Sequence, residues 1–174
     1  SYGPSPKVIE YIESQNFLGA HRYPNIDGKK LREKIGKVNN LDPNQIVLGC
    51  GSDETLLFVA LAFCKDGDEI IHAKYGFEMY PIITKIVGAT SKFIKEDENF
   101  KIKASAIINE VTPSTKIIYL ANPNNPTGTY LERTEIVNLL NELPKNIILV
   151  LDCAYAEYVI KDDYDKGFSL VEDF

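Results

Sequence analysis

The sequence has 174 residues, which is enough for one compact core and short for two full domains. Apolar residues make up 44% of it and charged residues 25%, as in an ordinary globular protein. The formal net charge of -6, without a cluster of Lys and Arg, argues against a nucleic-acid partner. No apolar run approaches the roughly 20 residues that cross a bilayer, and no signal-peptide pattern is present, so we expect no membrane association.

The cysteines and histidines bear on the compartment and on metal binding. Cys50, Cys64 and Cys153 are widely spaced and odd in number, which favours reduced thiols in the cytoplasm over a disulfide framework. His21 and His72 lie far apart, and no Cys/His spacing matches a metal site. We therefore expect a cytoplasmic protein without a bound metal.

Two helices are predicted near the N-terminus, the first over residues 7–15. Asp27 is placed to cap the second, in which Leu31, Ile35 and Val38 recur at helical spacing. Residues 1–40 are therefore predicted to form an N-terminal extension of the main domain.

Residues 41–174 alternate between strand and helix patterns. Ser52 is placed to cap an apolar helix over 53–64, and the charged segment 95–103 reads as a solvated loop. The other elements are predicted strands at 46–48, 69–73, 91–94, 116–120 and 147–151, and predicted helices at 79–87, 104–111 and 134–143. The strands at 46–48, 116–120 and 147–151 are apolar enough to be buried, the last two on both faces, as parallel strands are. The alternation predicts an α/β fold, a mostly parallel sheet with helices on both faces.

Three polar clusters follow predicted strands, and ligands of parallel sheets collect at the carboxyl ends of the strands. The first cluster is Gly49-Cys50-Gly51-Ser52-Asp53-Glu54, a glycine turn that opens a helix. A helix N-terminus offers free N–H groups and a partial positive charge, which suit a phosphate, although an ordinary capped helix has the same pattern. Glu54 stands where a dinucleotide-binding fingerprint has its third glycine, and the Gly-Lys-Ser/Thr of a P-loop is absent.

The second and third clusters carry an amide and a carboxylate. In Asn122-Pro123-Asn124-Asn125-Pro126-Thr127-Gly128, two prolines and a glycine make a rigid turn in which Asn125 can present its amide. The third cluster, Asp152-Cys153-Ala154-Tyr155, follows a predicted strand. A partly buried Asp152 needs a cation as its partner, whereas a solvated one does not, and the motif alone leaves both interpretations open.

Together the three clusters resemble the large domain of fold-type-I enzymes that use pyridoxal 5'-phosphate (PLP), in particular the histidinol-phosphate aminotransferase family, over nearly the whole chain. Gly51-Ser52-Asp53-Glu54 is similar to the phosphate turn of that family. Asn125-Pro126-Thr127-Gly128 matches its Asn-Pro-Thr-Gly motif, and Asp152-Cys153-Ala154-Tyr155 matches Asp-x-Ala-Tyr. Arg22-Tyr23-Pro24 and Phe77-Glu78-Met79-Tyr80 narrow the resemblance to the histidinol-phosphate branch.

The resemblance implies roles for five residues of the three clusters. Ser52 and the Asp53 amide would bind the phosphate of PLP. Asp152 would pair with the pyridinium nitrogen and keep it protonated, so that the ring withdraws electrons. Asn125 and Tyr155 would hydrogen-bond the phenolic oxygen.

Two further aromatic residues acquire roles from the same resemblance. Phe77 aligns with the residue that stacks on the cofactor ring, although a core phenylalanine is the alternative. Tyr23 aligns with the residue that reaches the phosphate of the neighbouring subunit's cofactor. The resemblance thus implies a homodimer with shared active sites, with residues 1–40 as a dimer-contact segment.

The lysine that attaches the cofactor in this family is expected beyond Phe174. Lys166 lies too close to Asp152, and Asp165 precedes it where the family has serine. An arginine that assists the phosphate and a small C-terminal domain with a substrate-binding arginine are expected farther on as well. The PLP-binding domain over 41–174 is therefore expected to be incomplete and inactive by itself.

The leading functional expectation is transamination between histidinol phosphate as amino donor and the 2-oxo acid 2-oxoglutarate. An aromatic amino-acid aminotransferase and a phosphothreonine-type decarboxylase share the expected cofactor site and stay open. A catalytically silent regulatory protein with the same fold also stays open. A nucleotide-binding module that uses only the Ser52 turn is disfavoured by Asn125 and Asp152.

Overall fold

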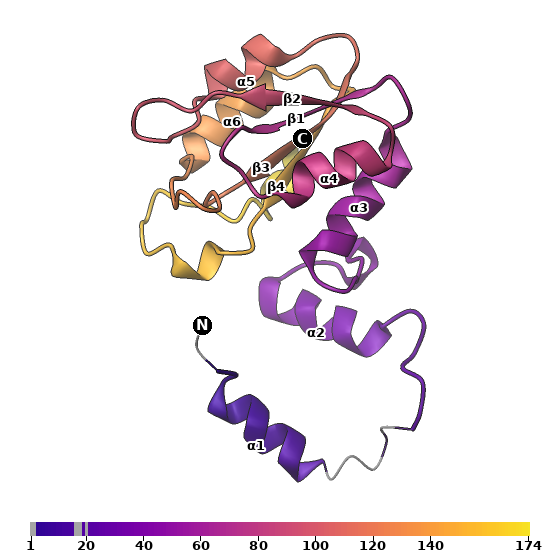
Figure 1. Cartoon of the computed structure of the whole chain (residues 1–174). Helices are drawn as coiled ribbons and strands as arrows, with labels where there is room; N and C mark the ends of the chain where they lie inside the picture. The colour runs from indigo at the N-terminus through magenta and orange to yellow at the C-terminus, as the bar shows by residue number, and fades with distance from the viewer. Residues whose placement is uncertain (1–2, 16–18, 20) are drawn as a thin grey trace. The chain divides into compact units, whose positions relative to one another are not determined.

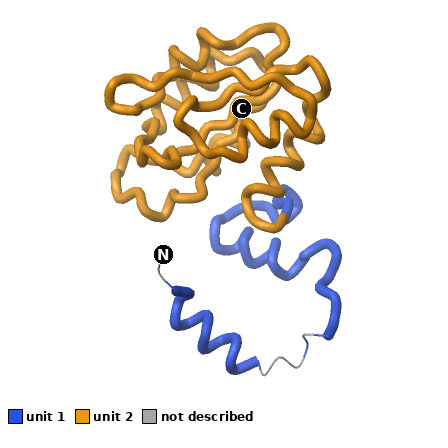
Figure 2. Tube along the Cα trace, in the orientation of Figure 1, with its two compact units in different colours: residues 1–48 blue, residues 49–174 orange. Residues whose placement is uncertain are grey.

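The computed structural model describes residues 3–15, 19 and 21–174. It divides into two compact units, Ser1–Leu48 and Gly49–Phe174, which Figure 2 shows in blue and orange. In the described part, no helix is both long and apolar enough to cross a membrane. The dimer-contact role expected for residues 1–40 stays a prediction.

The first unit consists of short helices. They are α1 (Pro6–Ser14), α2 (Lys29–Asn39) and the 3-10 helix η1 (Pro43–Gln45), so both predicted helices are confirmed. The N-cap of α2 is Gly28 rather than Asp27, because the backbone there has a φ of 56°, which glycine adopts without a steric penalty. Asp27 still contributes, since its carboxylate accepts a hydrogen bond from the backbone N–H of Lys29 at 3.1 Å.

The strand predicted at 46–48 is wrong. The backbone is extended at Ile46, but none of the four strands in the described residues pairs with this segment, and Val47 is exposed. A strand exists only where a neighbouring strand satisfies its N–H and C=O groups. An apolar run as short as this one therefore does not by itself predict a strand.

The second unit is built on a parallel sheet. Its strands are β1 (Glu69–Ala73), β2 (Thr90–Ile94), β3 (Thr115–Ala121) and β4 (Ile148–Asp152), in the order β2-β1-β3-β4. All three pairings are parallel, so the predicted fold class and these four predicted strands are confirmed. The chain leaves β1 toward β2 and returns to form β3 on the other side of β1. The order therefore reverses between β1 and β3, where ligands of such sheets bind.

Helices cover both faces of this sheet, as predicted (Figure 1). The first face carries α3 (Ser52–Phe63) and α4 (Met79–Ile86), and the second carries α5 (Ala104–Glu110) and α6 (Arg133–Glu142). Alternate strand residues point to opposite faces. Ile70, Ile117 and Tyr119 pack with Leu56, Ala60 and Ile83 on the first face, and Ile71, Ile118 and Leu120 pack with Ile107, Ile136 and Leu139 on the second. A 3-10 helix, η2 (Ala156–Tyr158), and the short α7 (Leu170–Asp173) follow β4.

Burial separates two strands that look alike in sequence. Every residue of β3 except Lys116 is buried, as predicted. All five residues of β4 are only half-buried, so the prediction that it is buried on both faces is wrong. The reason is position, because β3 has a neighbour on each side, whereas β4 is the last strand in the observed order.

Candidate active site

The loops that carry the predicted site meet at one edge of the sheet. Since all four strands are parallel, the carboxyl ends of β1, β3 and β4 lie at the same edge. Ala121 and Asp152, the last residues of β3 and β4, are register partners, and the Asn122 N–H donates to the Asp152 carbonyl oxygen at 2.9 Å. The second and third polar clusters are therefore neighbours, as predicted.

Asp152 is half-buried and is held by two donors. Its Oδ2 accepts a hydrogen bond from the Tyr80 hydroxyl at 2.8 Å, and its Oδ1 accepts one from the Ala154 N–H at 3.2 Å. Neither donor is charged, and within residues 3–15, 19 and 21–174 this carboxylate forms no ion pair. Asp152 is thus a partly buried carboxylate that can still accept a cationic partner.

Tyr80 is a site residue whose role the sequence did not reveal. It lies on α4 with no exposed surface, and its ring stacks on Tyr119 with the centroids 5.1 Å apart and the planes 9° from parallel. Burial, together with the charge of Asp152, raises the pKa of the Tyr80 hydroxyl above its ordinary value, so the group is a neutral donor. The sequence did contain a signal for this contact. Tyr80 and Ile83 share the inward face of a helix, and a buried tyrosine hydroxyl requires a hydrogen-bond partner.

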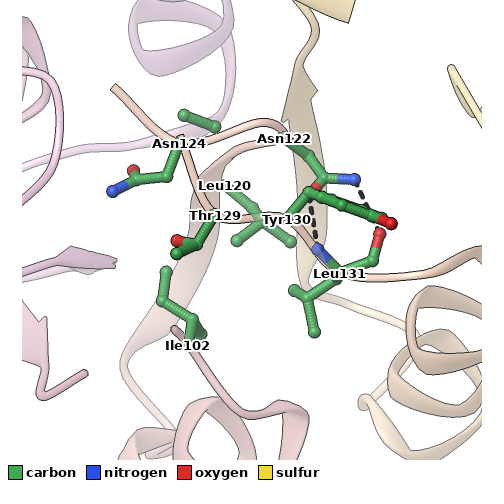
Figure 3. Close-up of a pocket in the computed structure, with 8 residues that line it drawn as sticks. Ile102, Leu120, Asn122, Asn124, Thr129, Tyr130 and Leu131 are labelled. Carbon is green, nitrogen blue, oxygen red and sulfur yellow. Dashed lines mark hydrogen bonds between the residues drawn. The ribbon is translucent and has the colours of Figure 1, made fainter. Parts of the chain in front are cut away.

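The turn after β3 is held by the side chain of Asn122. Its Oδ1 accepts from the Leu131 N–H at 2.7 Å, and its Nδ2 donates to the Leu131 carbonyl oxygen at 3.0 Å, the two dashed lines of Figure 3. Two further bonds of 2.8 Å close the turn, from the Asn124 N–H to the Thr129 carbonyl and from the Gly128 N–H to the Asn124 carbonyl. The rigid turn predicted from the prolines is therefore present, and a buried asparagine supports it.

Asn125 and Tyr155 line one open pocket of about 410 Å³, together with Pro123, Pro126 and Tyr158. Asn125 is half-buried, and Tyr155 is 46% exposed. The side chain of neither residue forms a hydrogen bond with any described residue, so both polar groups are available to a ligand. The structure thus brings these two predicted site residues together.

Phe77 lies in the loop after β1, which is held in place through Tyr75. Glu96 Oε1 accepts from the Tyr75 N–H at 2.8 Å, and Asn124 Nδ2 donates to the Tyr75 carbonyl oxygen at 2.9 Å. Phe77 is half-buried and meets Tyr80 edge-on, with ring centroids 5.7 Å apart. It also lines an open pocket of about 500 Å³ with Pro126, so it contacts the core and faces a cavity at once.

The same contacts correct one prediction. Residues 95–103 form a loop, but Glu96 is only 7% exposed, so the segment is not solvated throughout. Its charge pattern concealed a carboxylate that turns inward to bond the Tyr75 N–H.

Ser52 is the first residue of α3 and not its cap. Gly51 takes the N-cap position with a φ of 80° and a ψ of -177°, a conformation open essentially to glycine alone. Cys50 N–H donates to Glu54 Oε2 at 2.6 Å, which closes the turn. Ser52 and Asp53 are exposed, and the Ser52 hydroxyl forms no hydrogen bond with any described residue, so the start of this helix can accept an anion.

Tyr23 is the last predicted site residue, and Lys166 is the lysine that the sequence disfavours as the cofactor-binding one. Tyr23 is fully exposed in the first unit, and its role at a neighbouring subunit's cofactor stays a prediction. Lys166 Nζ pairs with Glu157 at 2.7 Å, so its amine is already engaged.

Known proteins with similar sequences and structures identify the family of this chain. The family model described as aminotransferase class I and II matches residues 1–173. A curated histidinol-phosphate aminotransferase from Ruegeria pomeroyi is 45% identical over 169 residues, which are 97% of this chain and 46% of that protein. The chain thus spans about half the length of such relatives.

Two solved structures share the fold. Histidinol-phosphate aminotransferase from Sinorhizobium meliloti, solved in complex with pyridoxal-5'-phosphate, matches with a TM-score of 0.85 at 22% identity, over 94% of this chain and 44% of that one. L-threonine-O-3-phosphate decarboxylase from Porphyromonas gingivalis matches with a TM-score of 0.76 at 27% identity, over 94% of this chain and 49% of that one. The family model covers almost every residue, and the chain belongs to the class I and II aminotransferase family.

Proposed function

We propose that this chain forms the cofactor-binding part of a PLP-dependent aminotransferase that uses histidinol phosphate as amino donor and 2-oxoglutarate as acceptor. The observation that carries the proposal is Asp152, a half-buried carboxylate at the ligand-binding edge of a parallel sheet, held by two neutral donors. The histidinol-phosphate aminotransferase that is 45% identical to this chain supports the choice of substrate.

The residues present fit PLP. When bound, PLP supplies a ring that withdraws electrons from the substrate carbon, provided that its nitrogen carries a proton. Asp152 is suited to hold that proton at the ring nitrogen, because a carboxylate partner stabilises the cationic form. The half-buried Asp152 carboxylate forms no ion pair with any described residue, so it is available to a cationic ligand.

The other residues would bind and orient the same molecule. The exposed Ser52 hydroxyl and the Asp53 N–H would hold the phosphate at the start of α3, where the helix dipole favours an anion. Asn125 and Tyr155, whose side chains form no hydrogen bond with any described residue, would bond the phenolic oxygen. Phe77 would stack on the ring, from a loop whose backbone is held at Tyr75.

Two parts of the proposal concern the assembly. A homodimer with shared sites would bring Tyr23 to the cofactor of the neighbouring subunit, in keeping with its full exposure. A cytoplasmic location is in keeping with the free thiols of Cys50, Cys64 and Cys153. The chain spans 46% of the Ruegeria pomeroyi relative, and the lysine that attaches the cofactor would lie in the rest of the protein.

A decarboxylase acting on a phosphorylated amino acid is the second candidate. It is favoured by the structural match to L-threonine-O-3-phosphate decarboxylase at 27% identity. Both candidates need the same cofactor contacts, so Asp152, Asn125 and Tyr155 do not separate them.

The test is a substrate panel on the full-length protein loaded with PLP. Histidinol phosphate, an aromatic amino acid and phosphothreonine are each supplied with 2-oxoglutarate, and glutamate and carbon dioxide are measured. Glutamate formed fastest from histidinol phosphate is the expected result. Carbon dioxide release from phosphothreonine, or no turnover of any substrate by protein shown to bind PLP, would overturn the proposal.

A further inference from the structure

The hydroxyl of Tyr80 contacts Asp152, and the packing around the tyrosine ring restricts its movement. It reaches Oδ2 of Asp152 at 2.8 Å, and the tyrosine has no exposed surface. Tyr119 stacks against one face of its ring, and Phe77 meets the ring edge-on at 89°. These contacts leave the phenol a single orientation, toward the carboxylate.

The contact has a direction because the phenol is neutral. Burial raises the pKa of the Tyr80 hydroxyl, and the negative charge of Asp152 raises it further. Tyr80 therefore stays protonated and acts as the donor of this hydrogen bond. A donor stabilises the ionised form of a carboxylate. The Ala154 N–H donates to the other oxygen, so the two bonds together restrict rotation of the carboxylate.

We infer that Tyr80 is a positioning residue that fixes the Asp152 carboxylate in the orientation in which it would pair with the ring nitrogen of the cofactor and keep that nitrogen protonated. This inference rests on the proposed function, since it needs PLP at the carboxyl edge of the sheet. The inference adds Tyr80 to the site as a supporting residue, which lies in the core on the first face of the sheet and would not touch the cofactor.

The test compares PLP with 1-deaza-PLP, in which carbon replaces the ring nitrogen, on full-length protein stripped of cofactor. Tyr80→Phe removes only the hydroxyl and leaves the ring packing intact. We expect this variant to bind PLP up to about tenfold more weakly than the unaltered protein, because its carboxylate is no longer held in one orientation before the cofactor binds. Binding of the deaza analogue should not change, because it lacks the atom that Asp152 serves.

Tyr119→Phe is the matched control. Its hydroxyl is also buried in the first-face core, but it donates to the Leu56 carbonyl oxygen at 2.8 Å and not to the site. A merely structural role for these hydroxyls predicts that both variants weaken PLP and its analogue equally. A second readout is the nitrogen-15 chemical shift of ring-labelled PLP, which should move toward the unprotonated value in Tyr80→Phe alone.

The outcomes separate this inference from the proposed function. If Asp152→Asn abolishes the preference for PLP over the analogue while Tyr80→Phe retains it, the role of Tyr80 is overturned and the site stands. If the unaltered protein has no preference, the pairing of Asp152 with the ring nitrogen fails first. Should Tyr80→Phe fold poorly, 3-fluorotyrosine at this position makes a stronger donor, and an unchanged preference would then overturn the inference.

Discussion

The Asn122→Ala substitution should lower the free energy of unfolding by about 2 to 5 kcal/mol. Asn122 is 1% exposed, and its side chain bonds both the N–H and the C=O of Leu131, which is itself 2% exposed. Truncation leaves two buried backbone groups without partners, at about 1–3 kcal/mol each. A cavity of about 10 Å³, roughly the space of one water, lies beside these residues (Figure 3). In the variant, this cavity and the space left by the removed side chain can hold a water that offsets part of the loss.

The assay is urea unfolding followed by circular dichroism, with the slope of the transition compared between variants. Asn99→Ala is the control, because Asn99 is exposed in a loop and its side chain bonds no described residue, so its effect should stay within about 0.5 kcal/mol. A loss below about 1 kcal/mol for Asn122→Ala, at an unchanged slope, would show that the two bonds to Leu131 do not hold the turn.

Three further predictions concern the site, the protonation of the core and the assembly. In the full-length enzyme, Asp152→Asn should lower kcat about 10²–10³-fold with cofactor still bound, because a neutral amide cannot hold the ring nitrogen protonated, and near-normal turnover would contradict the assignment. Burial lowers the pKa of His72, so that on acidification the unfolded chain binds a proton at this residue before the folded chain does. The stability that a neutral His72 contributes is therefore complete above a pH of about 6.5 and is lost as the pH falls below it. Urea unfolding from about pH 7.5 to about pH 5.5 should therefore show a smaller drop in His72→Phe than in the unaltered protein, and equal drops would refute this cause. Mixing Tyr23→Phe subunits with Asp152→Asn subunits should restore activity if sites are shared, whereas mixed dimers without recovery would place Tyr23 in its own subunit's site or in none.

The alternation of apolar strands and amphipathic helices was readable because it is a local property. The helix at residues 79–87 and the strand at residues 69–73 follow from side-chain periodicity and nearby turn residues. The strand at 46–48 failed because pairing is not local, and a short apolar run in extended conformation pairs only where a neighbour is present. The same reason separates β3 from β4, since equally apolar sequences differ in burial through their place in the sheet.

The residues of the candidate site also fall into those that local sequence predicts and those that depend on distant partners. The sequence predicts Asn125, Asp152 and Tyr155 as site residues, because each stands in a short motif after a strand, and parallel strands bring such motifs to one edge. Ser52 was placed correctly at a helix start, but Gly51 took the cap, because its backbone conformation excludes side chains. The supporting residues Asn122 and Glu96 were not recognised, since their partners lie 9 and 21 residues away.

The sequence by itself therefore determined the fold class, the family resemblance and the residues that we propose face the ligand. These depend on composition, periodicity and short motifs that act over a few residues. Only the tertiary structure decided which strand lies at the edge of the sheet and which buried groups support the site. Tyr80 is the clearest case, because its hydroxyl meets Asp152 across 72 positions of the chain, and only the packing of α4 against the sheet brings the two together.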